Sequence, residues 1–579
     1  MSGCIIIMLV AIYWAASQQT GLGQPPEKPV LKASSENSPR QPERISPAQA
    51  ERNGAPSATP PGLPEKLPIS GMKPARLQPG LSVLRYRIST NSELCQQFFD
   101  QGLAYLYSYV WMEAVRNFET ALQYDKDSAI TWWALSRAFE AWGKQKESRQ
   151  ALEKAWQLRH LASHSEQLLI QARAQEKGLL PELTTPEARR QAAINTIDQL
   201  LSLHEEDEEA WFYRAQLACG GRLFGGNVNA VPFYKALLRI NPLHPGANHE
   251  LVHYYENARQ PALGWTASEN YIASSPGIPH AWHMQAHLAT RLGRWDRANA
   301  SSSRAVALQH AYHRDMEVRP AEDHQYVHHV EVLAISLVHD GRFREARQLR
   351  DLPGITNKNA PVWFRLMLAS GDYASARQIA EANRRTDKIL GAYQSALTAL
   401  ACDDLAQTEA EIHVLQQAWQ ETRSRSNLRL KLLETRGVYL CRLAARQPDG
   451  LVSPSAGLAL LEQAVRLTQD DYRHHAWGNG AYYMEIWGTE ALRLGQWDIA
   501  EEAFLEALAH DSGSVRAALG LAYLKEEQQD RLLAERYHQL ARRFWSQADA
   551  GQLERLQQHY RELVRQGRAL VSPSQGATP

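Results

Sequence analysis

Apolar residues follow a helical period along most of the chain. From about Thr90 onward the large apolar positions recur every three or four residues and proline becomes rare, while long strand-like alternations are absent. Spacings of three and four place these residues on one face of a helix. The pattern therefore predicts an all-α body that begins near residue 90.

The helical pattern repeats with a period of 34 residues. Large residues come early in each repeat, small residues near its middle and alanines in its second half. Small residues let two helices approach closely, and each hairpin then covers the apolar side of its neighbour. We expect nine or ten helical hairpins. The first matching sets are Phe98, Gly102, Tyr105, Ala114, Phe118 and Ala121, then Trp132, Leu135, Phe139, Gly143, Leu152 and Ala155.

This period resembles the tetratricopeptide repeat, which implies an all-α, right-handed superhelical solenoid with a concave groove. The chain is also similar to a family of bacterial tetratricopeptide proteins that has no firm biochemical role. The similarity covers most of residues 92–545. Its hallmarks include HPGANHELVHYYE at 244–256, HAWHMQAHL at 280–288 and DHQYVHHVEVLAISLVHDGR at 323–342.

The first 88 residues have a different composition. Residues 4–16 form a continuous apolar run, which suits a signal peptide and is short for a membrane span of about 20 residues. Thirteen of the 28 prolines lie between residues 24 and 79. We predict a signal peptide or membrane anchor over 1–17 and a disordered linker over 18–88. The body would be exported to the periplasm, or tethered to a membrane and facing the periplasm.

Five regions are expected after the linker. The period is clear at both ends of the body and degenerate in the middle. The predicted regions are N-terminal hairpins over 89–205, a histidine-rich region over 206–350, degenerate hairpins over 351–470, C-terminal repeats over 471–565 and a flexible tail over 566–579.

The composition excludes several functional classes. The 579 residues contain 63 Lys and Arg against 63 Asp and Glu, and this zero net charge argues against nucleic acid as the partner. Five cysteines are too few for a disulfide-built scaffold. Phosphate loops, dinucleotide-binding fingerprints and nucleophile elbows are absent, so we expect no nucleotide cofactor.

Histidines are concentrated in one part of the chain. Twelve of the 21 lie between His244 and His339, a window in which even spacing would place about three or four. Several are spaced by three or four, which puts them on one helix face. In the repeat frame they occupy positions that line the concave groove, on neighbouring helices about 10 Å apart. They are His249, His253, His280, His283, His287 and, in a further repeat, His328.

Three interpretations of these histidines stay open. They can hold a divalent metal (zinc, or copper or iron), because neutral imidazoles bind these ions. They can instead form hydrogen bonds that stiffen a polar groove, or join Arg291 and Arg294 in binding an anionic peptide. The candidate metal ligands are His249, His253, Glu256, His280, His283, His287 and His328.

The concave groove is predicted to bind a protein or peptide. Trp132 fits a core position of its repeat, whereas Trp133 would face the groove and anchor the ligand. Arg137 and Arg291 are expected to line the same groove. The leading hypothesis is a non-catalytic scaffold whose groove is shaped by a metal site.

The competing hypothesis is a metal-dependent hydrolase. Residues 249–253 read HELVH, an H-E-x-x-H string in which two histidines hold zinc and the glutamate acts as general base on the bound water. Glu250 would be this base. Glu256 and Arg259 stand where one protease class continues with Gly and His. The third ligand would then be Glu256, His283 or His287. Three ligands from one straight helix strain tetrahedral geometry, so we expect His283 or His287.

Overall fold

The computed structural model describes residues 62–219, 227–422, 426–447 and 453–571. The predicted signal or anchor segment, the linker up to residue 61 and residues 572–579 lie outside these ranges. Within the described ranges every regular element is a helix, which confirms the predicted all-α class. None of these helices is both long enough and apolar enough to cross a membrane.

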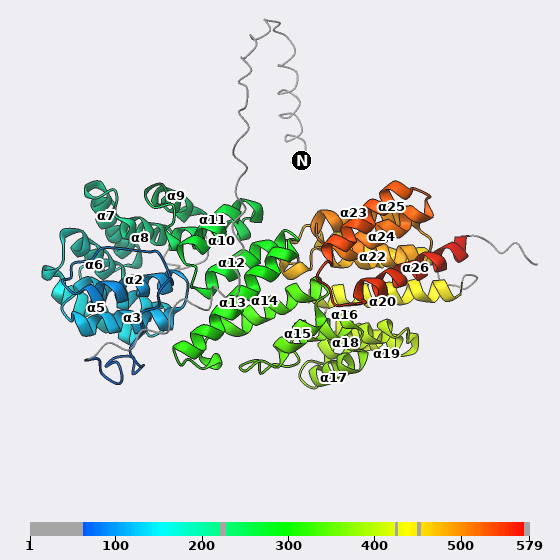
Figure 1. The fold of residues 1–579 in the computed structure, drawn as a ribbon, viewed down its shortest axis with the longest axis horizontal. Coiled ribbons are helices and arrows are strands. Elements are labelled where there is room, and N and C mark those ends of the chain that lie inside the picture. Colours follow the sequence, from blue (N-terminus) through cyan, green and yellow to red (C-terminus); the bar gives the residue numbers. More distant parts are fainter. Residues whose placement is uncertain (1–61, 220–226, 423–425, 448–452, 572–579) are drawn as a thin grey trace, which may run out of the picture. The chain divides into compact units, whose positions relative to one another are not determined.

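Successive helices pack as pairs. Helix α2 (Glu93–Tyr107) packs on α3 (Trp111–Tyr124), and the pairing continues to α24 and α25. Figure 1 shows such pairs side by side, for example α2 with α3 and α22 with α23. The described ranges hold twelve such pairs rather than nine or ten. The additional pairs arise because residues 156–205 and 351–470 form helices even where their repeat pattern is weak.

The other helices follow in chain order. The N-terminal region contains α4 (Ala129–Ala141), α5 (Gln145–Leu158), α6 (His164–Glu176), α7 (Pro186–Leu203), α8 (Glu208–Ala218) and α9 (Val231–Ile240). The central region contains α10 (Pro245–Asn257), α11 (Trp265–Ser274), α12 (Pro279–Arg291), α13 (Trp295–Asp315), α14 (Tyr326–His339) and α15 (Phe343–Arg350). The C-terminal region contains α16 (Pro361–Ser370), α17 (Tyr373–Arg384), α18 (Lys388–Ala401), α19 (Leu405–Thr422), α20 (Ser426–Arg446), α21 (Pro454–Thr468), α22 (Tyr482–Arg493), α23 (Trp497–His510), α24 (Val515–Glu527), α25 (Arg531–Phe544) and α26 (Gln552–Val571). Short 3₁₀ helices are η1 (Arg159–Leu161), η2 (Val228–Ala230), η3 (Pro261–Gly264), η4 (Pro320–Glu322) and η5 (Ala476–Gly478).

Small residues stand where paired helices approach each other, as the repeat pattern predicts. A Cβ atom at Gly102 of α2 would lie 2.6 Å from the ring of Phe118 in α3. Gly488 and Gly520 approach Phe504 in the same way near the C-terminus. A larger side chain would force these helix pairs apart.

Buried apolar side chains form two large clusters. The first extends from Ala75 to Leu288, and the second from Val306 to Val564. The boundary between them falls between α12 and α14. Both helices carry histidines, so the histidine-rich region straddles the junction of the two clusters.

The described part of the predicted linker packs against the helices, so the prediction of disorder up to residue 88 is wrong for residues 62–88. We call residues 62–90 the N-terminal strap. It has no helical or strand-like period, because its apolar side chains are irregularly spaced among prolines. Five of them are nevertheless buried: Leu67, Ala75, Leu81, Leu84 and Ile88.

Side chains of the helices hold the backbone of the strap. Its N–H groups donate to side-chain oxygens instead of to a neighbouring strand, which satisfies groups that would be costly to bury unpaired. The bonds run from Ala75 to Thr120 (2.9 Å), Gln78 to Gln101 (2.9 Å), Tyr86 to Asp100 (3.0 Å), Ile88 to Gln96 (3.0 Å) and Ser89 to Glu166 (2.7 Å).

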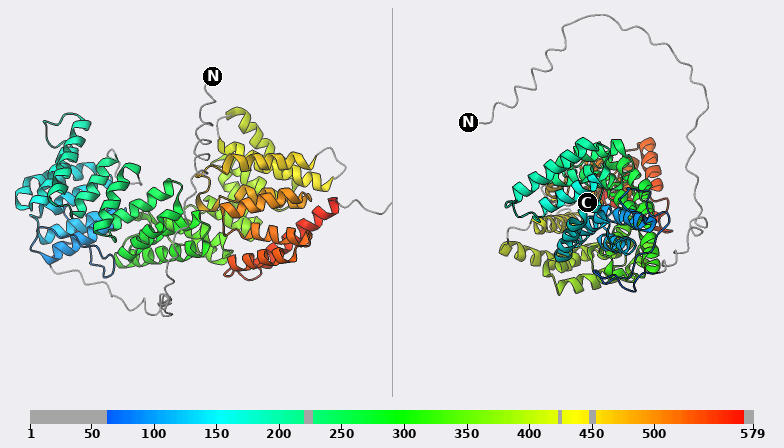
Figure 2. Two further views of the ribbon diagram at one scale, coloured as in Figure 1. Left: turned by 90° about the horizontal axis from the view of Figure 1, so that it is seen from above. Right: turned by 90° about the vertical axis from the view of Figure 1, so that its left-hand side faces the viewer.

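The last helix is longer than predicted. Helix α26 continues to Val571, so residues 566–571 of the predicted flexible tail are helical. Its residues Tyr560, Leu563 and Val564 are buried, and the helix packs against α20, α22 and α24 (Figures 1 and 2).

Candidate metal centre

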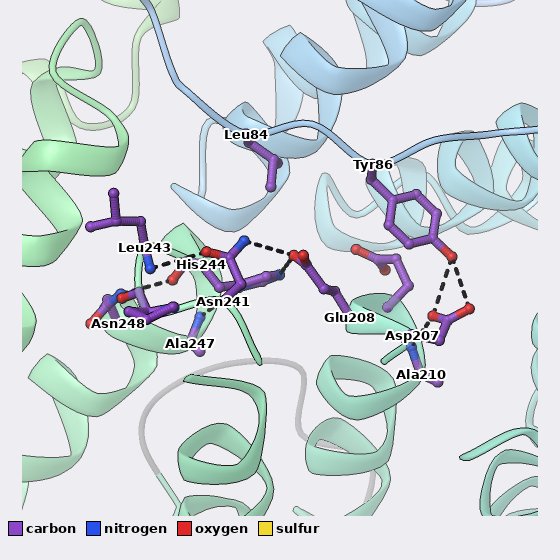
Figure 3. Close-up of polar contacts among 12 residues, drawn as sticks. Leu84, Tyr86, Asp207, Glu208, Ala210, Asn241, Leu243, His244, Ala247 and Asn248 are labelled. Atoms are coloured by element: carbon purple, nitrogen blue, oxygen red, sulfur yellow. Dashed lines mark hydrogen bonds and ion pairs between the residues drawn. The ribbon is translucent and has the colours of Figure 1, made fainter. Parts of the chain in front are cut away.

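Helix α10 begins with a histidine cap. The Nδ1 atom of His244 accepts the backbone N–H of Ala247 at 3.1 Å, and the Asn248 amide donates to the carbonyl of His244 at 3.0 Å (Figure 3). His244 is buried against the rings of Tyr107 and Phe212. These contacts fix the start of the helix that carries the first histidines of the site.

Three helices bring the predicted histidines together as two sets of three. In each set the candidate donor nitrogens all lie within 4.8 Å of one another. Helix α10 supplies two members of the first set, α12 supplies one member of the first and two of the second, and α14 completes the second. The first histidine set is His249, His253 and His280, and the second is His283, His287 and His328.

The first set contains both histidines of the HELVH string, but its third member differs from our expectation. We predicted His283 or His287 beside the string, and the structure places His280 there. The Nε2 atoms of His280 and His249 are 3.0 Å apart. His283 and His287 instead approach each other, with 2.7 Å between their Nε2 atoms.

The histidines are more deeply buried than predicted. We expected them to line a solvent-facing groove, but His249 is 0% exposed and His283 is 1% exposed. Tyr271 stacks on His249, and α14 places His329 over His283 at 3.9 Å between ring centroids. Among the six, His328 alone is classed as exposed.

Each set has one histidine whose orientation is fixed from outside the set. His249 Nδ1 lies 2.6 Å from the carbonyl oxygen of Tyr107. Because a carbonyl can only accept, this nitrogen carries the hydrogen and Nε2 keeps its lone pair. His287 Nδ1 lies 3.1 Å from the carboxylate of Glu256 and donates its hydrogen to it, so the Nε2 atom of His287 also keeps its lone pair. Outer hydrogen bonds of this kind orient metal-binding histidines.

Glu256 is an outer partner rather than a member of either set. Arg291 donates to it at 3.2 Å on the side opposite to the His287 bond, using the other carboxylate oxygen. Burial alone would raise the pKa of Glu256, but its interactions with His287 and Arg291 outweigh burial and bring the pKa to about 2. The carboxylate therefore stays ionised as an acceptor for His287.

Several imidazole nitrogens of the cluster are buried without a hydrogen-bond partner among the described residues. They are His253 Nε2, His280 Nδ1, His283 Nδ1 and His329 Nε2. An unpaired buried polar atom is unfavourable, so this many in one place calls for a specific explanation. A bound ion would supply a partner for His253 Nε2, whereas His280 and His283 turn their Nε2 atoms toward neighbouring histidines and His329 belongs to neither set.

Burial keeps these imidazoles neutral. It lowers the pKa of His253 to about 4. In the more deeply buried rings, burial together with the neighbouring imidazoles lowers the pKa well below 6.5: these are His249, His280, His283 and His329. Neutral imidazole is the form that binds a metal.

Tyr109 covers the first histidine set. Its ring lies 4.4 Å from His249 and 5.7 Å from both His253 and His280, between centroids. Its hydroxyl donates to Glu250 at 2.6 Å. Tyr109 has a φ of 59°, a left-handed conformation that is uncommon outside glycine and frequent at functional sites.

Trp477 covers the second histidine set from a distant part of the sequence. The residue belongs to η5, between α21 and α22, and its ring lies 4.7 Å from His287 and 5.4 Å from His328. It also has a positive φ, of 58°. In the same connection Tyr472 stacks under Arg291 and accepts from it through its carbonyl at 2.7 Å.

Sequence reasoning missed three residues of this site. His329 follows His328 directly, so the His-His pair was the available signal. Tyr109 occupies the turn position after α2 that Gly143 occupies after α4. Arg259, Asp403 and Gln529 occupy the same position after α10, α18 and α24, so this position gave no signal for the site. Trp477 lies too far along the chain for any local pattern to connect it with the site.

The predicted groove residues do not line an open groove. Trp133 is 0% exposed and Arg137 is 2% exposed, so the prediction that they contact a ligand is wrong. Helix α8 brings Glu209 within 2.6 Å of Arg137, whose guanidinium lies over the ring of Trp133. Arg291 is occupied by Glu256 and Tyr472. The pattern placed Trp133 on the wrong side because it could not show this buried ion pair.

A cavity of about 900 Å³ lies in the C-terminal region. Its lining includes Phe364 and Arg365 of α16, Tyr393 of α18, Glu434 of α20 and Tyr482 of α22. Both tyrosine hydroxyls donate to Glu434 at 2.7 Å, and Arg365 lies over the ring of Tyr482. The weak repeat pattern between residues 351 and 470 gave no indication of this cavity.

No family model and no curated protein matches this chain. Among solved structures, yeast Tom70 is 14% identical with a TM-score of 0.28, over 83% of this chain and 97% of that one. A human IFIT1 dimer with m7Gppp-AAAA is 14% identical with a TM-score of 0.25, over 79% and 91%. The TPR domain of P58(IPK) is 11% identical with a TM-score of 0.21, over 79% and 99%.

Proposed function

We propose that this protein is a metal-binding scaffold of the tetratricopeptide type, in which the histidine cluster holds a transition-metal ion. Zinc suits the three-nitrogen sets, and copper and iron are also bound by imidazole. The observation that carries the proposal is the pair of outer hydrogen bonds, from His249 to Tyr107 and from His287 to Glu256. Each fixes the tautomer that turns a lone pair toward the other histidines of its set.

A purely structural role explains the cluster less well. Histidines that only stiffen the protein would exchange hydrogen bonds, as His280 does with His249 and His287 with His283, and would leave few nitrogens unpaired. Here four ring nitrogens are buried and unpartnered among the described residues. An anionic ligand is also disfavoured, because Arg291 is already bound to Glu256 and Arg294 lies over Trp265.

Metal analysis of the purified full chain tests the proposal. We expect stoichiometric zinc, copper or iron by plasma mass spectrometry, in protein as isolated or after titration and dialysis. The double substitution His249→Ala and His287→Ala should abolish it, since one oriented ligand is removed from each set. His413→Ala is the matched control, because His413 is exposed on α19 outside the cluster. Undiminished binding by a folded double variant would refute the site.

A hydrolase remains the alternative, favoured by one specific observation. His249, His253 and His280 supply three ligands, two of them from the HELVH string, as in zinc hydrolases. Glu250 is the neighbouring carboxylate and is held by Tyr109. Glu250→Gln separates the two functions: retained metal with loss of a measured peptidase or esterase activity supports the hydrolase. Retained metal in a wild-type protein that hydrolyses neither substrate supports the scaffold.

The proposal also covers the surface that binds a partner and the cellular location of the protein. The C-terminal cavity, with aromatic walls and the polar groups of Arg365 and Glu434, suits a protein or peptide segment better than the buried surroundings of Trp133 do. We propose export to the periplasm, with residues 1–17 as signal or membrane anchor, on the evidence of the apolar run at 4–16.

A further inference from the structure

We infer that the cluster is a two-ion centre, with one transition-metal ion in each histidine set. The inference rests on the proposed metal-binding function and specifies the stoichiometry and architecture of the same site. It is argued from three properties of the sets: their separate donors, their separate supports and their contact with each other.

Each set is complete without the other. Three nitrogens within 4.8 Å of one another match the ligand number of a catalytic-type zinc site, which keeps a fourth position open. In a tetrahedral site with metal–nitrogen distances of about 2.0–2.1 Å, ligand nitrogens are about 3.3 Å apart. The closest Nε2 pairs, at 3.0 Å in the first set and 2.7 Å in the second, need to open only slightly to admit an ion.

Each set also has its own supports. The first is oriented by the carbonyl of Tyr107 and covered by Tyr109. The second is oriented by Glu256 and covered by Trp477. A single-ion site would need one set of outer partners and one cover. The duplication of both points to two ions.

The sets meet on α12. His280 of the first set and His283 of the second are three residues apart, with 5.6 Å between their ring centroids. His329 lies against both, at 5.8 Å from His280 and 3.9 Å from His283. The two ions would therefore be neighbours in one buried site, and their repulsion would make the second bind more weakly than the first.

The donor chemistry limits which ions fit. Both sets consist of imidazole nitrogens, and the nearest carboxylate of the second set, Glu256, is already paired with Arg291. Magnesium, calcium and manganese prefer oxygen ligands, so they should not bind here. Zinc(II) and copper(I) are the appropriate probes.

Stoichiometry in variants of the full chain tests the inference. His253 and His328 are the least buried members of their sets, so replacing them is the mildest change available. The apoprotein is titrated with zinc(II), and anaerobically with copper(I), against a competing chelator of known affinity. We expect two ions per chain in the wild type and in His413→Ala, and one ion in each of the single variants His253→Ala and His328→Ala. The variant that carries both His253→Ala and His328→Ala should bind none.

The outcomes separate this inference from the function on which it rests. One ion per wild-type chain overturns the two-ion centre and leaves the proposed metal site standing. Loss of both ions in either single variant, with unchanged circular dichroism, also overturns it, because the sets would then form one site. No bound zinc, copper or iron in the wild type removes the proposed metal function itself.

Discussion

At the scale of single residues, the candidate site contains two aromatic side chains in a conformation that glycine adopts more easily. A left-handed backbone costs a residue with a Cβ atom roughly 1–2 kcal/mol. Tyr109 and Trp477 both have this conformation, and each covers one histidine set. Arg259, Glu317, Asp403 and Gln529 share this conformation outside the histidine sets, so what distinguishes Tyr109 and Trp477 is the position of their rings.

His244 makes the stability of α10 sensitive to acid. Burial lowers the pKa of His244 to about 3, from 6.5 in an unfolded chain. The folded state thus binds fewer protons, so this contribution is fully present above pH 6.5 and is lost as the pH falls toward 3. At pH 5 the loss is about 2 kcal/mol.

Urea unfolding at pH 7.5 and pH 5.0 measures this effect. In His244→Asn the side-chain oxygen can still cap α10, but the titration is removed. We expect the variant to be less stable at pH 7.5, because packing on Tyr107 and Phe212 is reduced, and to lose less stability on acidification than the wild type. Equal losses in the two proteins would contradict the assignment.

Much of the site could be predicted at this scale, for a simple reason. The spacings of His249 with His253, and of His283 with His287, follow directly from the helical period. Their burial could not be predicted in the same way, because it depends on α14 and on a connection more than 180 residues away. Which histidines share a set also depends on how α10 and α12 pack, which the sequence pattern leaves undefined.

At the scale of elements, the N-terminal strap is held by side chains from neighbouring helices. Gln101 of α2 makes the most direct attachment. Its oxygen accepts the N–H of Gln78 and its amide donates to the carbonyl of Arg76, both at 2.9 Å. The strap therefore depends on individual side chains, where a β-strand would depend on a continuous ladder.

Replacing Gln101 should release this part of the strap. Gln101→Ala leaves the N–H of Gln78 and the carbonyl of Arg76 without these partners, a change of about 1–3 kcal/mol. We expect faster hydrogen exchange over residues 74–80 and faster tryptic cleavage after Arg76. Gln97→Ala is the control, because Gln97 is on the same helix and bonds only to Glu93 in the described contacts. If exchange in the strap is the same in both variants, Gln101 does not hold it.

The elements differ in how well the sequence predicts them. Paired helices with crossing points such as Gly102 are defined locally, by a period that recurs along the chain. The strap has no period, and its buried residues, such as Leu67 and Leu84, are diluted by proline. Its partners lie up to 244 residues away, as for Lys73 and Glu317. Composition alone therefore suggested disorder.

At the scale of the whole molecule, the histidines lie where the two apolar clusters meet. Residues of α10 and α12 belong to the first cluster, and residues of α14 belong to the second. An ion bound by His283 and His287 of α12 together with His328 of α14 would connect them. Metal binding should therefore stabilise the junction as well as the local helices.

Thermal unfolding with and without metal measures this coupling. A ligand that binds only the folded state adds about 2.7 kcal/mol at a concentration of 100 Kd. We expect zinc to raise the unfolding midpoint of the wild type and of His413→Ala, and to leave the double variant His249→Ala and His287→Ala unchanged. An equal rise with magnesium would indicate a non-specific effect of divalent ions and contradict the prediction.

The break between the two apolar clusters has a mechanical consequence. At this break α12 and α14 are joined through α13, by a small apolar cluster of Ala289, Trp295 and Ala298, and by the imidazole rings that α12 and α14 place against each other. An ion held by His283, His287 and His328 would add a direct cross-link between α12 and α14, and with it between the two halves of the body.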